Sequence, residues 1–343
     1  MMVDKRKFKD TNVSLLGLGT MRLPCETEQK RESNPNIDYD KAQSLVDLAY
    51  KNGVNYFDTA YMYHCGKSEA FIGYALKKYP RDTYFIADKL PIWMCDTKED
   101  MKRVFDEQLE RTGMDYFDFY LLHSLDKENF EKCENFDAYD FLKQMQKEDK
   151  IKYIGFSFHG TVDDLRNIVS AHKWDFAQIQ MNYLDWENQN AKMLYQILEY
   201  AGIPTIVMGP VRGGKLALVN DEISDMFKSL KPDNSPASWA MGFVASHKNI
   251  ITILSGMNSA EQMLDNLSTL TDFKPFTDIE YSLCEKAAAI INKSEVISCT
   301  GCDYCQPCPK GIKISSFFSL YNSVISGEID INSGRDKYNS YKV

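Results

Sequence analysis

The chain has 343 residues, of which 44% are hydrophobic and 26% charged, and its formal net charge is −9. These proportions are ordinary for a globular protein, and the length allows one large domain with an appendage. No apolar run approaches the roughly 18 residues of a membrane span, and the basic start lacks the apolar stretch of a secretory signal. A negative charge without a lysine or arginine block argues against a nucleic-acid surface. We therefore expect a cytoplasmic protein that binds neither membranes nor nucleic acid.

Short apolar runs alternate with longer amphipathic stretches along most of the chain. The predicted strands are residues 13–20, 54–60, 83–90, 117–124, 151–158, 176–183, 203–210 and 250–257. Helical patterns lie between them at residues 39–52, 67–78, 98–112, 136–148 and 188–200. Several runs are apolar on both alternations, which is typical of parallel strands covered on both faces. Glycines at positions 53, 113 and 202 follow three of the helical patterns and predict helix ends.

Eight strand and helix units within about 250 residues favour an α/β fold of the (β/α)8 TIM barrel type. A doubly wound open sheet is the alternative, but no G-x-G-x-x-G motif opens a helix after the first strand. The alternation ends near residue 272. We expect a barrel over residues 1–275 and, over residues 276–343, a small C-terminal extension with a helix and a cysteine segment.

Two long loops, at residues 25–38 and 211–235, follow the first and seventh predicted strands. Both would lie at the C-terminal end of the barrel, where enzymes of this fold carry their chemistry. Tyr61, Tyr183 and Trp186 lie near this end and either line a substrate pocket or pack within the barrel.

Ionisable residues also mark the ends of three neighbouring predicted strands. The second strand ends with Asp58, and Tyr63 lies in the loop after it; Lys89 ends the third strand and His123 the fourth. Each has a structural alternative, such as a solvated lysine, a core histidine or a helix-capping aspartate. Their convergence on one rim favours a functional group.

This quartet suits proton transfer to oxygen. Tyrosine has an unperturbed pKa of about 10, and a neighbouring lysine ammonium favours the phenolate and lowers that pKa. Asp58 would pair with Lys89, and His123 would donate a hydrogen bond that places a carbonyl oxygen near Tyr63. The predicted chemistry is protonation of a developing alkoxide as a hydride reaches its carbon.

At these residues the sequence resembles the aldo/keto reductase family. The resemblance covers about residues 1–275, and its segments are 17–21, 55–76, 88–90, 113–124, 151–160, 178–183 and 255–267. It implies that the catalytic tetrad is Asp58, Tyr63, Lys89 and His123. It also implies NAD(P)H, bound extended without a Rossmann fold, and a small carbonyl or alcohol substrate.

The same resemblance implies which residues contact the dinucleotide. Ser157 and Gln178 would hold the nicotinamide carboxamide, and Asn266 would lie near the adenine. The other implied contacts are Thr20, Met21, Asp58, Met208, Gly256 and Gln262.

The chain departs from the family pattern where NADPH-specific members bind the 2′-phosphate. Gly256, Met257 and Gln262 stand where those members carry Lys, Ser and Arg. The choice between NADH and NADPH is therefore open, with Arg212 or Lys215 as replacement cations or as ordinary solvated loop residues.

Four of the nine cysteines lie within ten residues: Cys299, Cys302, Cys305 and Cys308. An odd total with one tight cluster does not indicate a disulfide framework. Three overlapping C-x-x-C steps followed by Pro309 resemble the ferredoxin-type 4Fe-4S motif of a subset of aldo/keto reductase-like proteins, although that subset carries a second cysteine run. Zinc is less favoured, because it usually takes two separated cysteine pairs, and the absence of any metal is the third alternative.

Two further functions remain alternatives to a reductase. The cysteine segment would work in an iron–sulfur electron-transfer protein with a redox partner, or the barrel would bind a nucleotide as a redox sensor. Nicotinamide transfers two electrons as a hydride, whereas a cluster passes one at a time, so the role of the cluster is open. All four tetrad residues are present, which favours the reductase.

Overall fold

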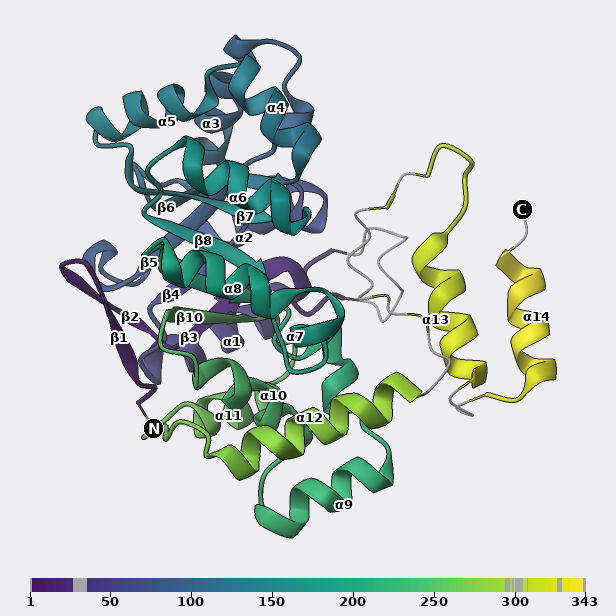
Figure 1. The fold of residues 1–343 in the computed structure, drawn as a ribbon. Coiled ribbons are helices and arrows are strands. Elements are labelled where there is room, and N and C mark those ends of the chain that lie inside the picture. Colours follow the sequence, from purple (N-terminus) through teal and green to yellow (C-terminus); the bar gives the residue numbers. More distant parts are fainter. Residues whose placement is uncertain are drawn as a thin grey trace.

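The computed structural model describes residues 2–26, 36–293, 297, 299 and 305–341, apart from 307 and 326–328. In this part of the chain, eight parallel strands close into a barrel in the order β10-β3-β4-β5-β6-β7-β8-β9 (Figure 1). The barrel strands are β3 (Leu16–Gly19), β4 (Tyr56–Asp58), β5 (Phe85–Leu90), β6 (Phe117–Leu125), β7 (Ile151–Phe158), β8 (Phe176–Gln180), β9 (Thr205–Met208) and β10 (Ile250–Ser255). The predicted TIM barrel is confirmed.

Helices surround the strands on the outside of the barrel (Figure 1). Those of the barrel are α1 (Tyr39–Lys51), α2 (Lys67–Leu76), α3 (Lys98–Thr112), α4 (Lys127–Asn135), α5 (Ala138–Lys147), α6 (Val162–Ala171), α7 (Asp185–Asn188), α8 (Ala191–Tyr200), α9 (Asp221–Leu230), α10 (Pro236–Ala245) and α11 (Ala260–Thr269). They are followed by α12 (Asp278–Lys293), α13 (Ile314–Ile325) and α14 (Ile331–Tyr341). No helix in the described residues is both long and apolar enough to cross a membrane.

The first predicted strand is wrong as a single element, because it divides between two sheets. Its start belongs to β2 (Thr11–Ser14), which pairs antiparallel with β1 (Lys5–Phe8), and the barrel strand β3 begins only at Leu16. Phe8 and Val13 pack with Tyr56 inside the barrel. The hairpin is anchored by Arg6, whose guanidinium donates to the backbone carbonyls of Ala245, His247 and Ile250. It therefore closes the N-terminal end of the barrel.

The strand sequences explain the close packing of the barrel interior. Every residue of β6 is buried, as expected for a parallel strand with the barrel core on one face and helices on the other. Neighbouring strands approach closely at Gly155, where a Cβ would lie 2.6 Å from the backbone oxygen of Phe176. Gly113 ends α3 in the left-handed conformation, with a φ of 63°, and confirms the helix end predicted there.

The C-terminal region begins with a helix that packs on the barrel. Tyr281 of α12 lies with its ring 5.7 Å from that of Phe243 in α10, and Cys284 is fully buried. Helices α13 and α14 pack against each other through Phe317, whose ring contacts Tyr338 and Tyr341. The domain boundary at residue 275 stays a prediction.

Candidate active site

The four residues predicted as a catalytic tetrad lie together at the C-terminal ends of three adjacent strands. Asp58 is the last residue of β4, Lys89 lies near the end of β5, and His123 lies in β6. These strands are neighbours, because β4 pairs with β5 and β5 with β6. Tyr63 opens a short turn after β4, at Tyr63–Gly66. The structure therefore brings all four side chains to one rim of the barrel.

Lys89 stands at the centre of this group. Its side chain is 0% exposed, and its Nζ lies 2.8 Å from both carboxylate oxygens of Asp58. Nζ also donates to the backbone oxygen of Thr59 at 2.6 Å and to Tyr63 Oη at 3.4 Å. A buried ammonium is costly unless it is paired and hydrogen-bonded, and here Asp58 supplies the opposite charge. Burial raises the pKa of Asp58, and the charge of Lys89 opposes that rise.

His123 faces this group from β6 and is buried. Its ring centroid lies 6.3 Å from that of Tyr63 and 5.0 Å from that of Trp93. Burial lowers the pKa of His123 well below its ordinary value of 6.5, and the charge of Lys89 lowers it further. The imidazole is therefore neutral near pH 7 and keeps one N–H donor. Sequence reasoning missed Trp93, and the available signal is an aromatic residue in the loop directly after β5.

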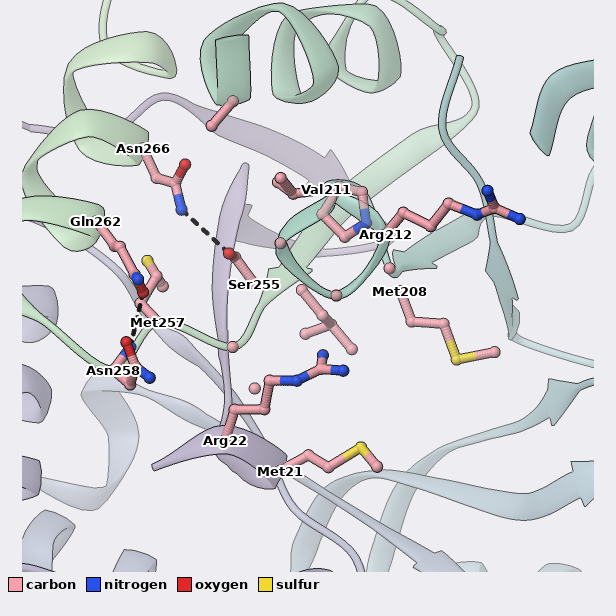
Figure 2. Close-up of a pocket in the computed structure, with 18 of the residues that line it drawn as sticks. Met21, Arg22, Met208, Val211, Arg212, Ser255, Met257, Asn258, Gln262 and Asn266 are labelled. Carbon is pink, nitrogen blue, oxygen red and sulfur yellow. Dashed lines mark hydrogen bonds between the residues drawn. The ribbon is translucent and has the colours of Figure 1, made fainter. Parts of the chain in front are cut away.

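A cavity extends from Asp58 and Tyr63 across the loops that follow β9 and β10 (Figure 2). Six further residues with implied dinucleotide contacts line it: Met21, Gln178, Met208, Gly256, Gln262 and Asn266. Figure 2 shows Gln262 and Asn266 at one side, with Asn266 Nδ2 donating to Ser255 Oγ at 3.0 Å. Arg22 also lines this cavity and was not predicted from the sequence. The cavity joins the tetrad to the start of α11.

Thr20 and Ser157 lie behind the cavity wall. Both are buried, and the Thr20 hydroxyl donates to the backbone oxygen of Asp58 at 2.8 Å. The Ser157 hydroxyl accepts a hydrogen bond from the backbone N–H of Ser124 at 2.7 Å. Neither residue lines the cavity within the described part of the chain. They support the strands, and their contact with a dinucleotide stays a prediction.

Gln178 has the chemistry to hold a nicotinamide carboxamide. Its Nε2 donates to Met208 Sδ at 3.5 Å, while its Oε1 is buried without a hydrogen-bond partner among the described residues. An unsatisfied buried oxygen costs about 1–3 kcal/mol, and an amide N–H₂ would satisfy it. This oxygen in the cavity wall is therefore an acceptor of the kind that a nicotinamide carboxamide needs, and the contact itself stays a prediction.

Arg212, in the loop after β9, lines the cavity but already pairs with a carboxylate, and its role as a cation for a 2′-phosphate stays a prediction. Arg212 Nε lies 3.1 Å from Asp185 Oδ1, and the two side chains are 4% and 0% exposed. In Figure 2 the Arg212 guanidinium points away from Gln262. Because a buried guanidinium depends on its carboxylate partner, Arg212 stays with Asp185. Lys215 is exposed in the same loop.

The three aromatic residues near the rim pack within the barrel. Tyr183 is 3% exposed and its ring contacts Phe227. The Trp186 ring lies 5.5 Å from that of Phe243. The Tyr61 hydroxyl donates to Glu107 in α3 at 2.7 Å. None of the three lines the cavity as far as the structure describes the chain.

The cysteine segment is only partly described. Cys302 lies outside the described residues, whereas Cys305 is exposed and Cys299 and Cys308 are half-buried. Across the described residues, no group of three or more His, Cys, Asp or Glu side chains is placed to hold a metal ion. The iron–sulfur cluster and its zinc alternative both stay predictions.

Comparison with known proteins identifies the family. The profile of the Aldo/keto reductase family matches residues 15–289. The NADH-specific methylglyoxal reductase of Escherichia coli is 24% identical over 304 residues, which cover 76% of this chain and 91% of that protein. The uncharacterized oxidoreductase YqkF of Bacillus subtilis is 25% identical over 298 residues, which cover 77% of this chain and 90% of that protein.

Solved structures share the fold. The aldo-keto reductase AKR11C1 of Bacillus halodurans, in its holo form, has a TM-score of 0.66 at 24% identity and covers 83% of this chain and 96% of its own. The thermostable aldo-keto reductase Tm1743, in complex with the inhibitor epalrestat, has a TM-score of 0.67 at 20% identity and covers 83% of this chain and 99% of its own. The barrel is thus the fold of these enzymes.

This chain belongs to the aldo/keto reductase family, because the family match spans most of its length. It is an oxidoreductase, as are relatives such as the methylglyoxal reductase and the glyoxal reductase of Bacillus subtilis.

Proposed function

We propose that this enzyme transfers a hydride between NAD(P)H and a small aldehyde or ketone, or the reverse from an alcohol, with Tyr63 as the acid–base group. The observation that carries the proposal is the buried Lys89 ammonium, which lies 2.8 Å from Asp58 and 3.4 Å from Tyr63 Oη. This arrangement places a positive charge beside the hydroxyl of Tyr63, a residue that lines the cavity. A hydroxyl so placed is a proton donor to a substrate in that cavity.

The mechanism divides the work among the four side chains. A nicotinamide held at Gln178 would supply the hydride that the carbonyl carbon accepts. Tyr63 Oη donates its proton to the carbonyl oxygen, so that no alkoxide charge remains there. The Lys89 ammonium stabilises the phenolate left on Tyr63, and Asp58 pairs with that ammonium and orients it. Neutral His123 donates a hydrogen bond to the same oxygen and holds it beside Tyr63.

We also propose that the enzyme uses NADH at least as well as NADPH. Gly256, Met257 and Gln262 carry no positive charge, and Asp265 adds a carboxylate to the same part of the cavity lining. A 2′-phosphate is doubly charged or nearly so and is favoured by arginine or lysine partners. These three positions therefore contribute little affinity for the extra phosphate, and Arg22, which lines the cavity beside Gly256, is the nearest basic side chain to them in the cavity lining as described.

The direct test is Tyr63→Phe, which removes one oxygen. We expect kcat for a panel of small aldehydes to fall about 10³-fold, within the range for general acids, while the Kd for NADH is unchanged. Tyr153→Phe is the matched control, because its hydroxyl bonds Asp10 at the other end of the barrel. Turnover is followed by loss of NADH or NADPH absorbance. Turnover of Tyr63→Phe equal to wild type would contradict the proposed role of Tyr63.

A second proposal concerns the cysteine segment. We propose that Cys299, Cys302, Cys305 and Cys308 bind a 4Fe-4S cluster, because their spacing supplies four thiolates and ends in a Cys-Pro step. Anaerobic reconstitution with iron and sulfide should give about four irons per chain and visible charge-transfer absorbance. Binding of zinc with no iron uptake would favour the alternative, and Cys302→Ser should abolish either.

A further inference from the structure

Tyr61 links the turn that carries Tyr63 to the outer helix α3. Its hydroxyl donates to Glu107 Oε2 at 2.7 Å and accepts from Arg111 Nη2 at 3.2 Å. The Arg111 guanidinium carbon lies 4.2 Å from the centre of the same ring, which adds a cation–π contact. The ring is therefore held both at its face and at its hydroxyl, two positions before Tyr63 in the sequence.

Arg111 is itself held in place from two helices. Its Nη1 donates to Glu69 Oε2 of α2 at 3.0 Å, and its Nη2 donates to Glu107 Oε2 at 3.2 Å. Glu69 is fully buried, so that its charge depends on this guanidinium. Helices α2 and α3 approach so closely that a Cβ on Gly73 would lie 2.0 Å from the Thr112 backbone oxygen. The Arg111 side chain thus has little freedom to move.

The same network reaches the strand that carries Lys89. Asp88 precedes Lys89 in β5, its Oδ1 accepts from the Lys89 backbone N–H at 2.8 Å, and its buried carboxyl interacts with the charge of Glu69. Burial raises the pKa of Asp88 well above its ordinary value, and the charge of Glu69 raises it further. The buried carboxyls of Asp88 and Glu69 thus interact, and Glu69 also pairs with Arg111 at 3.0 Å. Arg111 is therefore connected to the Tyr63 turn through Tyr61 and to the strand of Lys89 through Glu69 and Asp88.

The turn after Tyr63 needs such external support. His64, Cys65 and Gly66 all have positive φ angles, of 51°, 53° and 85°. Each non-glycine residue in the left-handed region costs about 1 kcal/mol or more, and it persists only when the surroundings hold it. A Cβ on Gly66 would lie 3.6 Å from Arg111 Nη1, so the guanidinium lies directly against this turn.

We infer that Arg111 and Tyr61 are positioning residues that hold Tyr63 Oη within reach of Lys89. The inference rests on the proposed role of Tyr63. The 3.4 Å contact between Lys89 Nζ and Tyr63 Oη is already near the limit of a hydrogen bond, so a small displacement of the turn breaks it. Neither Arg111 nor Tyr61 lines the cavity in the described residues, so both act through Tyr63 and not on the substrate.

The test uses two variants of the full-length enzyme and one matched control. Tyr61→Phe removes only the hydroxyl, and Arg111→Gln removes the guanidinium. Arg81→Gln is the control: Arg81 donates to buried Asp118 at 2.7 Å and lies 3.9 Å from the centre of the Tyr116 ring. The side chains of Arg81 and Arg111 are 26% and 33% exposed. The control therefore breaks an equivalent ion pair away from the tetrad.

We expect both test variants to lower kcat about 10- to 100-fold, the effect of misplacing a reacting group by about 1 Å. The KM for the aldehyde and the Kd for NADH should be unchanged, because neither residue reaches the cavity. The alkaline limb of the kcat profile should move to higher pH, because a more distant ammonium favours the phenolate less. Arg81→Gln should lower Tm as much as Arg111→Gln and leave kcat unchanged.

Each of the other outcomes contradicts either the inference or the proposed function. Unchanged kcat in Tyr61→Phe and Arg111→Gln, beside an inactive Tyr63→Phe, overturns the inference and leaves the proposed function standing. A loss of kcat in Arg81→Gln equal to that in Arg111→Gln shows a general structural effect and also overturns it. Full activity of Tyr63→Phe overturns the proposed function itself. If Arg111→Gln does not fold, Tyr61→Phe alone decides.

Discussion

Each end of the barrel buries a carboxylate that pairs with basic side chains, but the surroundings of the two carboxylates differ. At the N-terminal end, Asp118 of β6 accepts hydrogen bonds from the Ile86 backbone N–H at 3.0 Å, from Arg81 at 2.7 Å and from Lys152 at 2.8 Å. Its carboxylate is thus fully satisfied by the scaffold. At the C-terminal end, Asp58 shares one buried lysine with a tyrosine hydroxyl that lines the cavity.

The difference fits a structural role for the Asp118 arrangement and the proposed catalytic role for the Lys89 arrangement. Both cations around Asp118 are partly exposed, at 26% and 47%, so water screens their charges. Lys89 is 0% exposed, so its charge is poorly screened by water where it meets Asp58 and Tyr63, which both line the cavity. An electrostatic interaction stabilises a transition state more in a site that excludes water than in a solvated one.

The largest expected effect comes from Lys89→Met at the reactive end. We expect kcat to fall about 10³-fold, because Tyr63 loses the charge that stabilises its phenolate. Leaving Asp58 buried without a partner should also lower the free energy of unfolding by about 3 kcal/mol. Adding Asp58→Asn should restore that stability without restoring kcat. Recovery of kcat in the double variant would show that the charge of Lys89 is not needed.

At the N-terminal end, we expect Asp118→Asn to lower stability without lowering activity. We expect the free energy of unfolding, measured with urea, to fall by about 2–3 kcal/mol, because two cations lose their carboxylate but remain partly solvated. The kcat should stay within about twofold of wild type, because no tetrad residue contacts Asp118. If Asp118→Asn lost much of its kcat while the protein remained folded, the two ends of the barrel would not differ in their effect on activity.

The reactive end was largely predictable from the sequence, and the reasons are local. Asp58, Lys89 and His123 each stand at the end of an apolar run, and parallel strands in a barrel bring such ends together. The direction of Tyr61 was not predictable in the same way. Its hydroxyl meets Glu107, 46 positions further along the chain, and only packing of α2 on α3 places that partner there.

The N-terminal end was less predictable. The apolar residues from Val13 to Leu18 form one run in the sequence, yet the chain leaves the β1–β2 hairpin at Ser14 and enters the barrel at Leu16. Ser14 makes this change of direction, since its hydroxyl donates to the Leu16 backbone oxygen at 2.7 Å. A single serine within an apolar run is too weak a signal to divide a predicted strand.

A smaller effect is expected from Gln262→Arg, which adds a cation to the far side of the cavity. An arginine there should raise kcat/KM for NADPH relative to NADH about 10-fold, the value of one charge-assisted hydrogen bond to a phosphate. Gln262 now accepts from the Asn258 backbone N–H at 3.0 Å, so Gln262→Met controls for the loss of that bond. An unchanged ratio would place the 2′-phosphate elsewhere.

The smallest expected effect is an absence of change with pH. Because burial and Lys89 hold the pKa of His123 well below 6.5, this histidine stays neutral as the pH falls through 6.5. Protonation of an ordinary histidine would remove half of the neutral form at that pH. We therefore expect the single-turnover rate of hydride transfer to vary less than about twofold between pH 6 and 7.5, with His123→Gln measured alongside. A change in rate near pH 6.5 that His123→Gln abolishes would mean that His123 titrates like a solvated imidazole. In that case the C-terminal end of the barrel is not shielded from water at this residue, and the contrast with the solvated N-terminal end fails there.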